Sequence, residues 1–291
     1  TMLDNVIEHF IESAVDTNEL GTYRANSDRF KNYIKEGKNG YKKSAYSAYR
    51  ERSIGLGAMG FHSYLQFKGE SFEGLFASSI NHQVFKNIKT KAPKESKKLA
   101  ESRGEAPDMA GSGLRNASSS IICNGTSPSI EPTRANVYTH KTLTGSYKVQ
   151  NKYLEKLLKS KKQNTPEVWK DISANGGSVQ HLDFLTAEEK EVFKTAPEIN
   201  QIWIVEHAHQ RQQYICQSQS VNLFFIPPKA TEAQNIHDDF LQYVNDVHWY
   251  GAKNLKSLYY LRSDSVRNAE NVNIKIPRIN LEDVECIACE G

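Results

Sequence analysis

The second half of the chain alternates between helical and extended segments, and this alternation restricts the possible folds more than any other feature. Apolar spacing predicts a helix over about 197–217, followed by a strand over 220–226 that ends at two prolines. A second helix, over 231–253 with a capping box of Thr231 and Gln234, leads to a short buried strand over 255–261. Strands joined by a helical crossover pair in parallel, so the order predicts an α/β fold.

The rest of the chain is expected to add helices, loops and a tail. The apolar spacing predicts further helices over 3–14, 60–67 and 78–102. Pro93 should kink or interrupt the helix over 78–102. Thr165 should be the N-cap of a further helix that has Pro166 at its first position. Residues 116–147 are rich in Ser, Thr, Asn and Pro, which predicts loops and short strands. We expect residues 1–262 to form the folded domain and 263–291 to form a mobile tail.

The composition excludes several classes of protein. With 38% hydrophobic and 24% charged residues, the chain of 291 residues has enough apolar side chains for a sizeable core. No apolar run approaches the roughly 20 residues that cross a bilayer, and Asp4 and Glu8 interrupt the opening apolar segment, unlike in a signal peptide. The net charge of +3 is scattered rather than gathered in a stripe, so nucleic acid is not an expected partner. The cytoplasm is therefore the expected compartment.

Three glycines match the Gly-x-Gly-x-x-Gly spacing of dinucleotide-binding proteins: Gly55, Gly57 and Gly60. That motif needs a buried strand before it and an acidic residue about 20 residues later, at the end of a second strand. Residues 49–53 are too charged for such a strand, and no second strand follows. We expect a tight turn with close backbone packing here instead of a nucleotide site.

Two histidines, His207 and His209, are the nearest approach to a metal-binding pattern. Zinc ligands on one helix are spaced by three or four residues, whereas side chains two residues apart diverge by about 200°. We therefore expect both histidines to be solvated at the surface. Since no other residues have ligand spacing, we expect no metal in this chain.

Small hydroxyl residues gather in two stretches, 116–122 and 126–132. Free backbone N–H groups and hydroxyl donors at a helix start suit an anion such as phosphate. Serine-rich loops are also common without any ligand, so these residues alone leave both interpretations open.

Adjacent tyrosines, Tyr259 and Tyr260, stand in the last predicted strand. Neighbouring residues of a strand point to opposite faces, so both rings can be buried only if both faces are covered. One interpretation is a pair of core aromatics with satisfied hydroxyls. The other is a redox pair that passes an electron and a proton.

Four cysteines stand at Cys123, Cys216, Cys286 and Cys289. The first two are isolated, and an intracellular chain would keep them reduced. The last two form Cys-Ile-Ala-Cys in the predicted tail, where zinc would need two more ligands. A Cys-x-x-Cys pair on a mobile segment suits thiol–disulfide exchange, because it can carry reducing equivalents between two sites.

Taken together, these motifs resemble the C-terminal part of the large, catalytic subunit of class I ribonucleotide reductases. The matching segments are Arg-Ser-Ile-Gly-Leu-Gly-Ala-Met-Gly-Phe at 52–61, Thr-Ser-Pro-Ser-Ile-Glu-Pro at 126–132, Ser-Leu-Tyr-Tyr-Leu-Arg at 257–262, and Cys286-x-x-Cys289. They occur in the order of the family and over nearly the whole chain. The resemblance implies the family's ten-stranded α/β barrel, of which this chain would supply the later strands, and a flexible redox tail.

The resemblance also implies roles for individual residues. Tyr260 and Tyr259 would be the outer and inner members of a stacked pair that relays a radical toward the catalytic cysteine. Cys286 and Cys289 would reduce the active-site disulfide after each turnover and be recharged by thioredoxin or glutaredoxin. The loop that binds the substrate's phosphates would comprise Asn116, Ala117, Ser118 and Ser119. The radical itself would come from a metal-containing small subunit, and this chain would hold no cofactor.

Two departures from the family shape the functional expectation. The catalytic cysteine and its neighbours would lie upstream of Leu3, so we expect a split or partial subunit that needs an N-terminal fragment to reduce ribonucleoside diphosphates. In addition, Leu114-Arg115 runs directly into Asn116, without the short apolar strand that the family has there. The alternative function is a non-catalytic remnant that serves as a binding module; a thioredoxin-like oxidoreductase is a more distant third.

Overall fold

The computed structural model describes residues 2–13, 44, 48, 55–103, 126–127, 129–142, 145–229 and 231–263. In chain order, its helices are α1 (Met2–Ser13), α5 (Phe61–Lys68), α6 (Leu75–Arg103), α8 (Lys152–Ser160), α9 (Pro166–Ala174), α10 (Ala187–Val192), α11 (Gln201–Gln212) and α12 (Gln234–Asn254). Its strands are β1 (Val137–Thr142), β2 (Gly145–Gln150), β3 (Leu223–Phe224) and β4 (Leu261–Arg262). None of the helices in these residues has both the length and the apolar character needed to cross a membrane.

The predicted strand, helix and strand of the second half are confirmed in order and type as β3, α12 and β4. The last strand was expected over 255–261 and buried, which is wrong, because β4 is limited to Leu261–Arg262 and Leu261 is 49% exposed. The two strands pair in parallel, with Leu223 opposite Leu261 and Phe224 opposite Arg262. The predicted capping box is wrong, because α12 begins at Gln234 itself and its N-cap, Ala233, has no side-chain cap. The order of elements, rather than the cap, was the reliable part of the sequence pattern.

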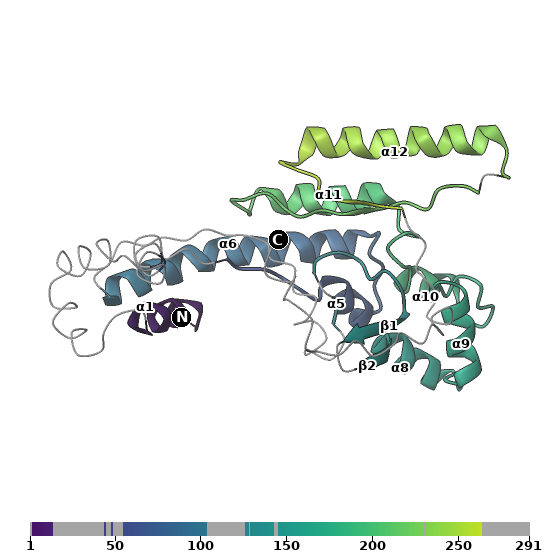
Figure 1. Cartoon of the computed structure of the whole chain (residues 1–291), viewed down its shortest axis with the longest axis horizontal. Helices are drawn as coiled ribbons and strands as arrows, with labels where there is room; N and C mark the ends of the chain where they lie inside the picture. Colours follow the sequence, from purple (N-terminus) through teal and green to yellow (C-terminus); the bar gives the residue numbers. More distant parts are fainter. Residues whose placement is uncertain are drawn as a thin grey trace, which may run out of the picture.

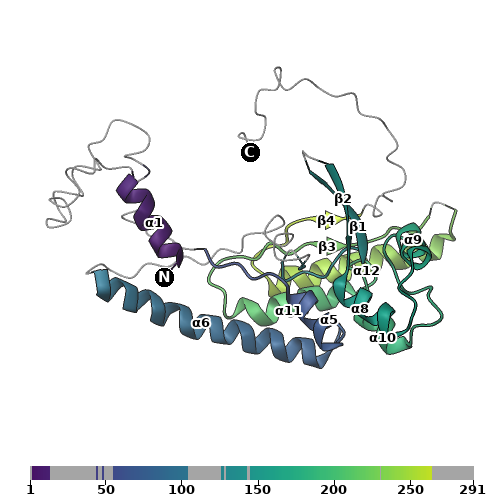
Figure 2. The same cartoon turned by 90° about the horizontal axis from the view of Figure 1, so that it is seen from below.

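A first hydrophobic core fills the space between these strands and the four helices α5, α6, α11 and α12. Helix α11 contacts both α6 and α12 and lies between them (Figure 1). The core combines side chains from α5, α11 and β3, with Leu65, Ile204 and Leu223 almost fully buried. Helix α6 extends beyond this core as a long rod (Figure 2) and runs through Pro93 without the predicted interruption.

A second hydrophobic core lies at the end of the molecule where α8, α9, α10 and the antiparallel β1–β2 hairpin gather (Figure 1). Thr165 caps α9 as predicted, since its hydroxyl accepts a hydrogen bond from Val168 N and Pro166 follows it at the first helical position. Helices α8 and α10 were not expected from the sequence. Both have an N-cap side chain that accepts backbone N–H bonds, Asn151 in α8 and Thr186 in α10.

Gly177, just after α9, leaves no room for a side chain. Its φ is +84°, and an added Cβ would lie 2.4 Å from Ala135 Cβ and 2.8 Å from Ala135 Cα. Its carbonyl accepts hydrogen bonds from Asn136 N at 3.1 Å and Asn136 Nδ2 at 3.0 Å. A glycine is therefore required here both by backbone conformation and by the close approach of residues 135–136.

We expect Gly177→Ala to lower the free energy of unfolding by at least about 2 kcal/mol, since the clash adds to the cost of a left-handed alanine. Gly69→Ala is the matched control: its φ is +73°, but no atom lies within 4 Å of the added Cβ. The control should cost only about 1 kcal/mol. Urea denaturation of both variants measures the difference, and equal losses would show that the contact with Ala135 is not restrictive.

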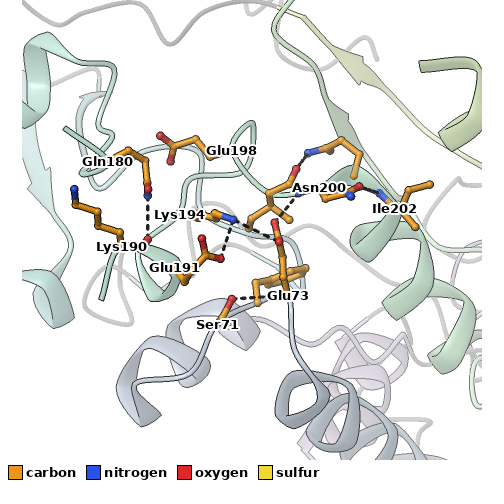
Figure 3. A network of polar contacts seen from close by, with 12 residues as sticks. Ser71, Glu73, Gln180, Lys190, Glu191, Lys194, Glu198, Asn200 and Ile202 are labelled. Atoms are coloured by element: carbon orange, nitrogen blue, oxygen red, sulfur yellow. Dashed lines mark hydrogen bonds and ion pairs between the residues drawn. The ribbon is translucent and has the colours of Figure 1, made fainter. Parts of the chain in front are cut away.

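A polar cluster joins the two cores (Figure 3). Glu73, in the turn before α6, accepts a hydrogen bond from Asn200 N at 2.6 Å and pairs with Lys194 Nζ at 3.5 Å. Lys194 also pairs with Glu191 at 2.8 Å. Burial lowers the pKa of Lys194, but the carboxylates of Glu191 and Glu73 outweigh it, so that this pKa is raised overall. The cluster fixes the end of α10 and the start of α11 against the α5–α6 turn.

Candidate functional site

The two adjacent tyrosines lie with their rings together immediately before β4. The ring centroids of Tyr259 and Tyr260 are 4.1 Å apart, and the ring planes are inclined by 51°. Two aromatic rings this close are in direct contact. The expectation that neighbouring strand residues point to opposite faces is therefore wrong at this position.

The backbone pairing explains why. Tyr259 N donates to Val221 O at 2.8 Å, whereas Leu223 N donates to Tyr260 O at 2.9 Å. In a regular parallel pair of strands, a single residue donates its N–H to the first strand and accepts a hydrogen bond at its carbonyl from the same strand. Here Tyr259 donates and Tyr260 accepts, so the tyrosine segment contains one extra residue opposite Val221–Leu223. Such a β-bulge redirects a side chain, and here it brings the second tyrosine to the side of the first.

The tyrosine pair is half exposed rather than buried. The exposed fractions are 54% for Tyr259 and 48% for Tyr260, and the next residue, Leu261, is 49% exposed. Of the two interpretations offered by the sequence, a pair of core aromatics does not fit the described part of the chain. The geometry is that of two phenols in contact at an accessible surface.

The strand beside the pair is held rigidly. Its residues Val221, Leu223 and Phe225 are buried in the first core. Phe224 N donates to Gln201 Oε1 at 2.8 Å, which ties β3 to the first turn of α11. The tyrosines therefore hydrogen-bond to a strand that is itself fixed by packing and by side-chain bonds, as a site with defined geometry requires.

Glu131 provides a further anchor for β3. Its Oε1 accepts hydrogen bonds from Asn222 N at 3.1 Å and from Asn222 Nδ2 at 2.5 Å. Arg211, on α11, is buried, and its Nε donates a hydrogen bond to Gln219 Oε1 at 2.6 Å. Burial lowers the pKa of Arg211 to about 9, although the carboxylate of Glu131 opposes that shift. Glu131 thus connects its own segment to β3, the strand beside the tyrosine pair.

The same segment is held by the glycine motif. Gly60 N donates to Ser127 O at 2.9 Å and to Ser129 O at 3.1 Å. Gly60 has a φ of +82°, and an added Cβ would lie 2.5 Å from Thr126 Cγ2. Ser63 and Ser127 also bond reciprocally, through each backbone N–H and the other's hydroxyl. The predicted close backbone packing is therefore confirmed at Gly60, whereas residues 55–60 form an extended approach to α5 rather than the predicted tight turn.

The other predicted site residues lie outside the described residues. These are the phosphate-loop residues Asn116, Ala117, Ser118 and Ser119, and the thiol pair Cys286 and Cys289. Their assignments stay predictions, as does the division into a domain over 1–262 and a tail over 263–291. Within the described residues, Cys216 is exposed and forms no disulfide bond.

The prediction that both histidines of α11 are solvated is wrong for His207. His209 is exposed, but His207 is fully buried, and its Nε2 lies 2.9 Å from the carbonyl of Phe72. Burial lowers the pKa of His207 to about 4, against the opposing effect of the Phe72 bond. His207 is therefore a neutral core residue that connects α11 to the turn before α6.

His62, on α5, is a second buried histidine. Its Nδ1 accepts a hydrogen bond from Thr133 N at 2.9 Å, which places the proton of the neutral ring on Nε2. Burial lowers its pKa to about 3, while a bond to the Val192 carbonyl opposes the shift. In the described part of the chain, no group of three or more His, Cys, Asp or Glu side chains has the arrangement of a metal site.

Comparison with known proteins identifies the family. The family model described as ribonucleotide reductase, barrel domain, matches residues 3–117 and 116–261. The chain belongs to the ribonucleotide reductase barrel-domain family. The two matched segments meet at 116–117, where the sequence lacks the apolar strand expected before Asn116.

Relatives of this reductase family match the chain over its full length. It is 40% identical over 307 residues to the ribonucleoside-diphosphate reductase large subunit of Invertebrate iridescent virus 3, covering 100% of this chain and 43% of the relative. It is 37% identical to the putative large subunit of Frog virus 3, covering 100% of this chain and 47% of the relative. The chain thus spans less than half the length of these two relatives.

A solved structure supports the fold. The class Id ribonucleotide reductase alpha subunit of Actinobacillus ureae matches with a TM-score of 0.64 and 38% sequence identity, over 80% of this chain and 44% of that subunit. The family and the α/β class expected from the sequence are confirmed by these similarities and by the parallel β3–α12–β4 unit.

Proposed function

We propose that this chain forms part of the catalytic large subunit of a ribonucleoside-diphosphate reductase. The reaction would convert a ribonucleoside diphosphate and a dithiol into the 2′-deoxyribonucleoside diphosphate, a disulfide and water. The observation that carries the proposal is the contact between Tyr259 and Tyr260, whose ring centroids are 4.1 Å apart and whose backbone is hydrogen-bonded to the buried strand β3 and the residues before it.

The chemistry of this pair is the exchange of one electron and one proton. A tyrosyl radical at Tyr260 can take both from the phenol of Tyr259, which leaves Tyr260 reduced and the unpaired electron on Tyr259. Direct contact of the rings favours this exchange, because electron and proton transfer both depend on short distance. Because both rings are about half exposed, the radical of the small subunit could approach Tyr260, and the catalytic cysteine could approach Tyr259.

The remaining roles rest on the family resemblance. Asn116, Ala117, Ser118 and Ser119 would hold the phosphates of the substrate, and Cys286 and Cys289 would return electrons to the active site. The expected partners are a radical-generating, metal-containing small subunit, the part of the large subunit that carries the catalytic cysteine, and thioredoxin or glutaredoxin. The cytoplasm stays the predicted compartment.

Copurification followed by an activity assay tests the proposal. The tagged chain, expressed with the small subunit and the other large-subunit sequences of the same genome, should capture both and reduce CDP when a dithiol is supplied. A chain that captures neither and yields no deoxycytidine diphosphate would instead favour the non-catalytic remnant. The relatives' shared naming as reductases favours the enzyme.

A further inference from the structure

A positive charge lies over the ring of one tyrosine of the pair. The guanidinium carbon of Arg262 is 4.6 Å from the ring centroid of Tyr260. This distance is well within the range of a cation–π interaction, for which arginine is the commonest partner. A third group, the guanidinium of Arg262, therefore lies beside the tyrosine pair and over the Tyr260 ring.

The backbone determines this placement. Arg262 stands in β4 opposite Phe224, and its carbonyl accepts a hydrogen bond from Phe225 N at 2.8 Å. Residues two apart in a strand share a face, which puts Arg262 on the side of Tyr260. The bulge that unites the two tyrosines thus ends before Arg262, and regular pairing resumes there.

The guanidinium lies over the Tyr260 ring. Arg262 Nε is buried without a hydrogen-bond partner among the residues that the structure describes. An arginine that faces an aromatic ring with a desolvated Nε interacts more strongly with the ring than one in open solvent.

We propose that Arg262 is a positioning residue of the radical relay, which holds the Tyr260 ring against Tyr259 and favours the unpaired electron on Tyr259. The inference rests on the proposed function. A cation over a ring stabilises the electron-rich phenol more than the electron-poor radical. The exchange between Tyr260 and Tyr259 moves one electron and one proton, and Arg262 keeps its charge and its protons throughout.

The contact can be tested without any activity. The full chain is labelled with 3-fluorotyrosine at position 260, and its fluorine resonance is recorded in Arg262→Gln, Arg262→Lys and a control. The control is Lys253→Gln, which removes a cation 5.7 Å from the ring of Trp249 on α12. Arg262→Gln should shift the resonance, Arg262→Lys should shift it less, and Lys253→Gln should leave it in place. A resonance that Arg262→Gln moves no more than the control does would overturn the proposal.

The relay role is tested in the assembled reductase. Removing the cation should lower kcat for CDP reduction by about 2-fold to 30-fold, the range that a cation–π contact supports, with KM for CDP unchanged. Arg262→Lys should recover part of the loss, and Lys253→Gln should match the unmodified enzyme. An Arg262→Gln enzyme with undiminished kcat would refute the relay role. A wild-type assembly without activity would refute the proposed function, while the fluorine resonance would still report the contact.

Discussion

Replacing Tyr259 with Phe is expected to remove CDP reduction from the assembled reductase, by more than about a hundredfold in kcat. Phenylalanine keeps the ring and its contacts, but it has no phenolic O–H, so it cannot take part in the exchange of an electron and a proton with Tyr260. Fold and assembly should be unchanged, because Tyr259 is 54% exposed and its backbone N–H bond to Val221 is retained.

The matched control for this variant is Tyr147→Phe. Tyr147, on β2, is also 54% exposed but lies in the hairpin beside the second core rather than beside Tyr260. Its replacement should leave kcat within about twofold of the unmodified enzyme. If Tyr259→Phe retained as much activity as Tyr147→Phe, the tyrosine pair could not carry the radical.

The second large effect is a loss of stability in mild acid. The pKa values of His62 and His207 are lowered to about 3 and about 4, whereas an unfolded histidine titrates near 6.5. Both are therefore neutral in the folded protein, and only the unfolded chain takes up protons as the pH falls below 6.5. The stability that the two neutral histidines contribute is fully present above pH 6.5. It declines as the pH falls from 6.5 toward their folded pKa values.

Between pH 7.5 and pH 5.0, the two histidines together should lower the free energy of unfolding by about 4 kcal/mol. This is a large part of the 5–15 kcal/mol typical of a folded protein. Urea denaturation at the two pH values measures the loss. His207→Gln, whose amide can replace the bond to the Phe72 carbonyl, should remove about half of the pH dependence.

His209→Gln is the control for the acid effect, because His209 lies on the same helix and is exposed. It should keep the full pH dependence. An identical loss of stability in wild type and His207→Gln would show that His207 is not held neutral by burial, and the account of the α11 packing would have to change.

The sequence predicted the parts of the fold that depend on regular periodicity. The strand, helix and strand that became β3, α12 and β4 were expected from apolar spacing alone, and so was the cap of α9 by Thr165. The close packing at Gly60 could also be expected, because the charged residues before it do not suit a nucleotide-binding strand. These features are local, so the sequence near each of them contains the required information.

The sequence could not predict features that depend on a distant partner. The bulge that unites Tyr259 and Tyr260 arises from their pairing with residues 221–223. The burial of His207 depends on a hydrogen bond that its Nε2 donates to the carbonyl of Phe72, 135 residues away. Arg262 ends the Ser-Leu-Tyr-Tyr-Leu-Arg segment at 257–262. Its position two residues after Tyr260 indicates that the two side chains share a face of the strand, but not that they are in contact.

The most direct test of the central claim is electron paramagnetic resonance of the assembled reductase with 3-aminotyrosine at position 260. Aminotyrosine is oxidised more easily than tyrosine, so a radical that passes this position should be trapped there. The account predicts an aminotyrosyl spectrum that forms when substrate is added, together with loss of the small-subunit radical. A small-subunit radical that persists unchanged, with no aminotyrosyl signal, would contradict the assignment of Tyr259 and Tyr260 as a radical relay.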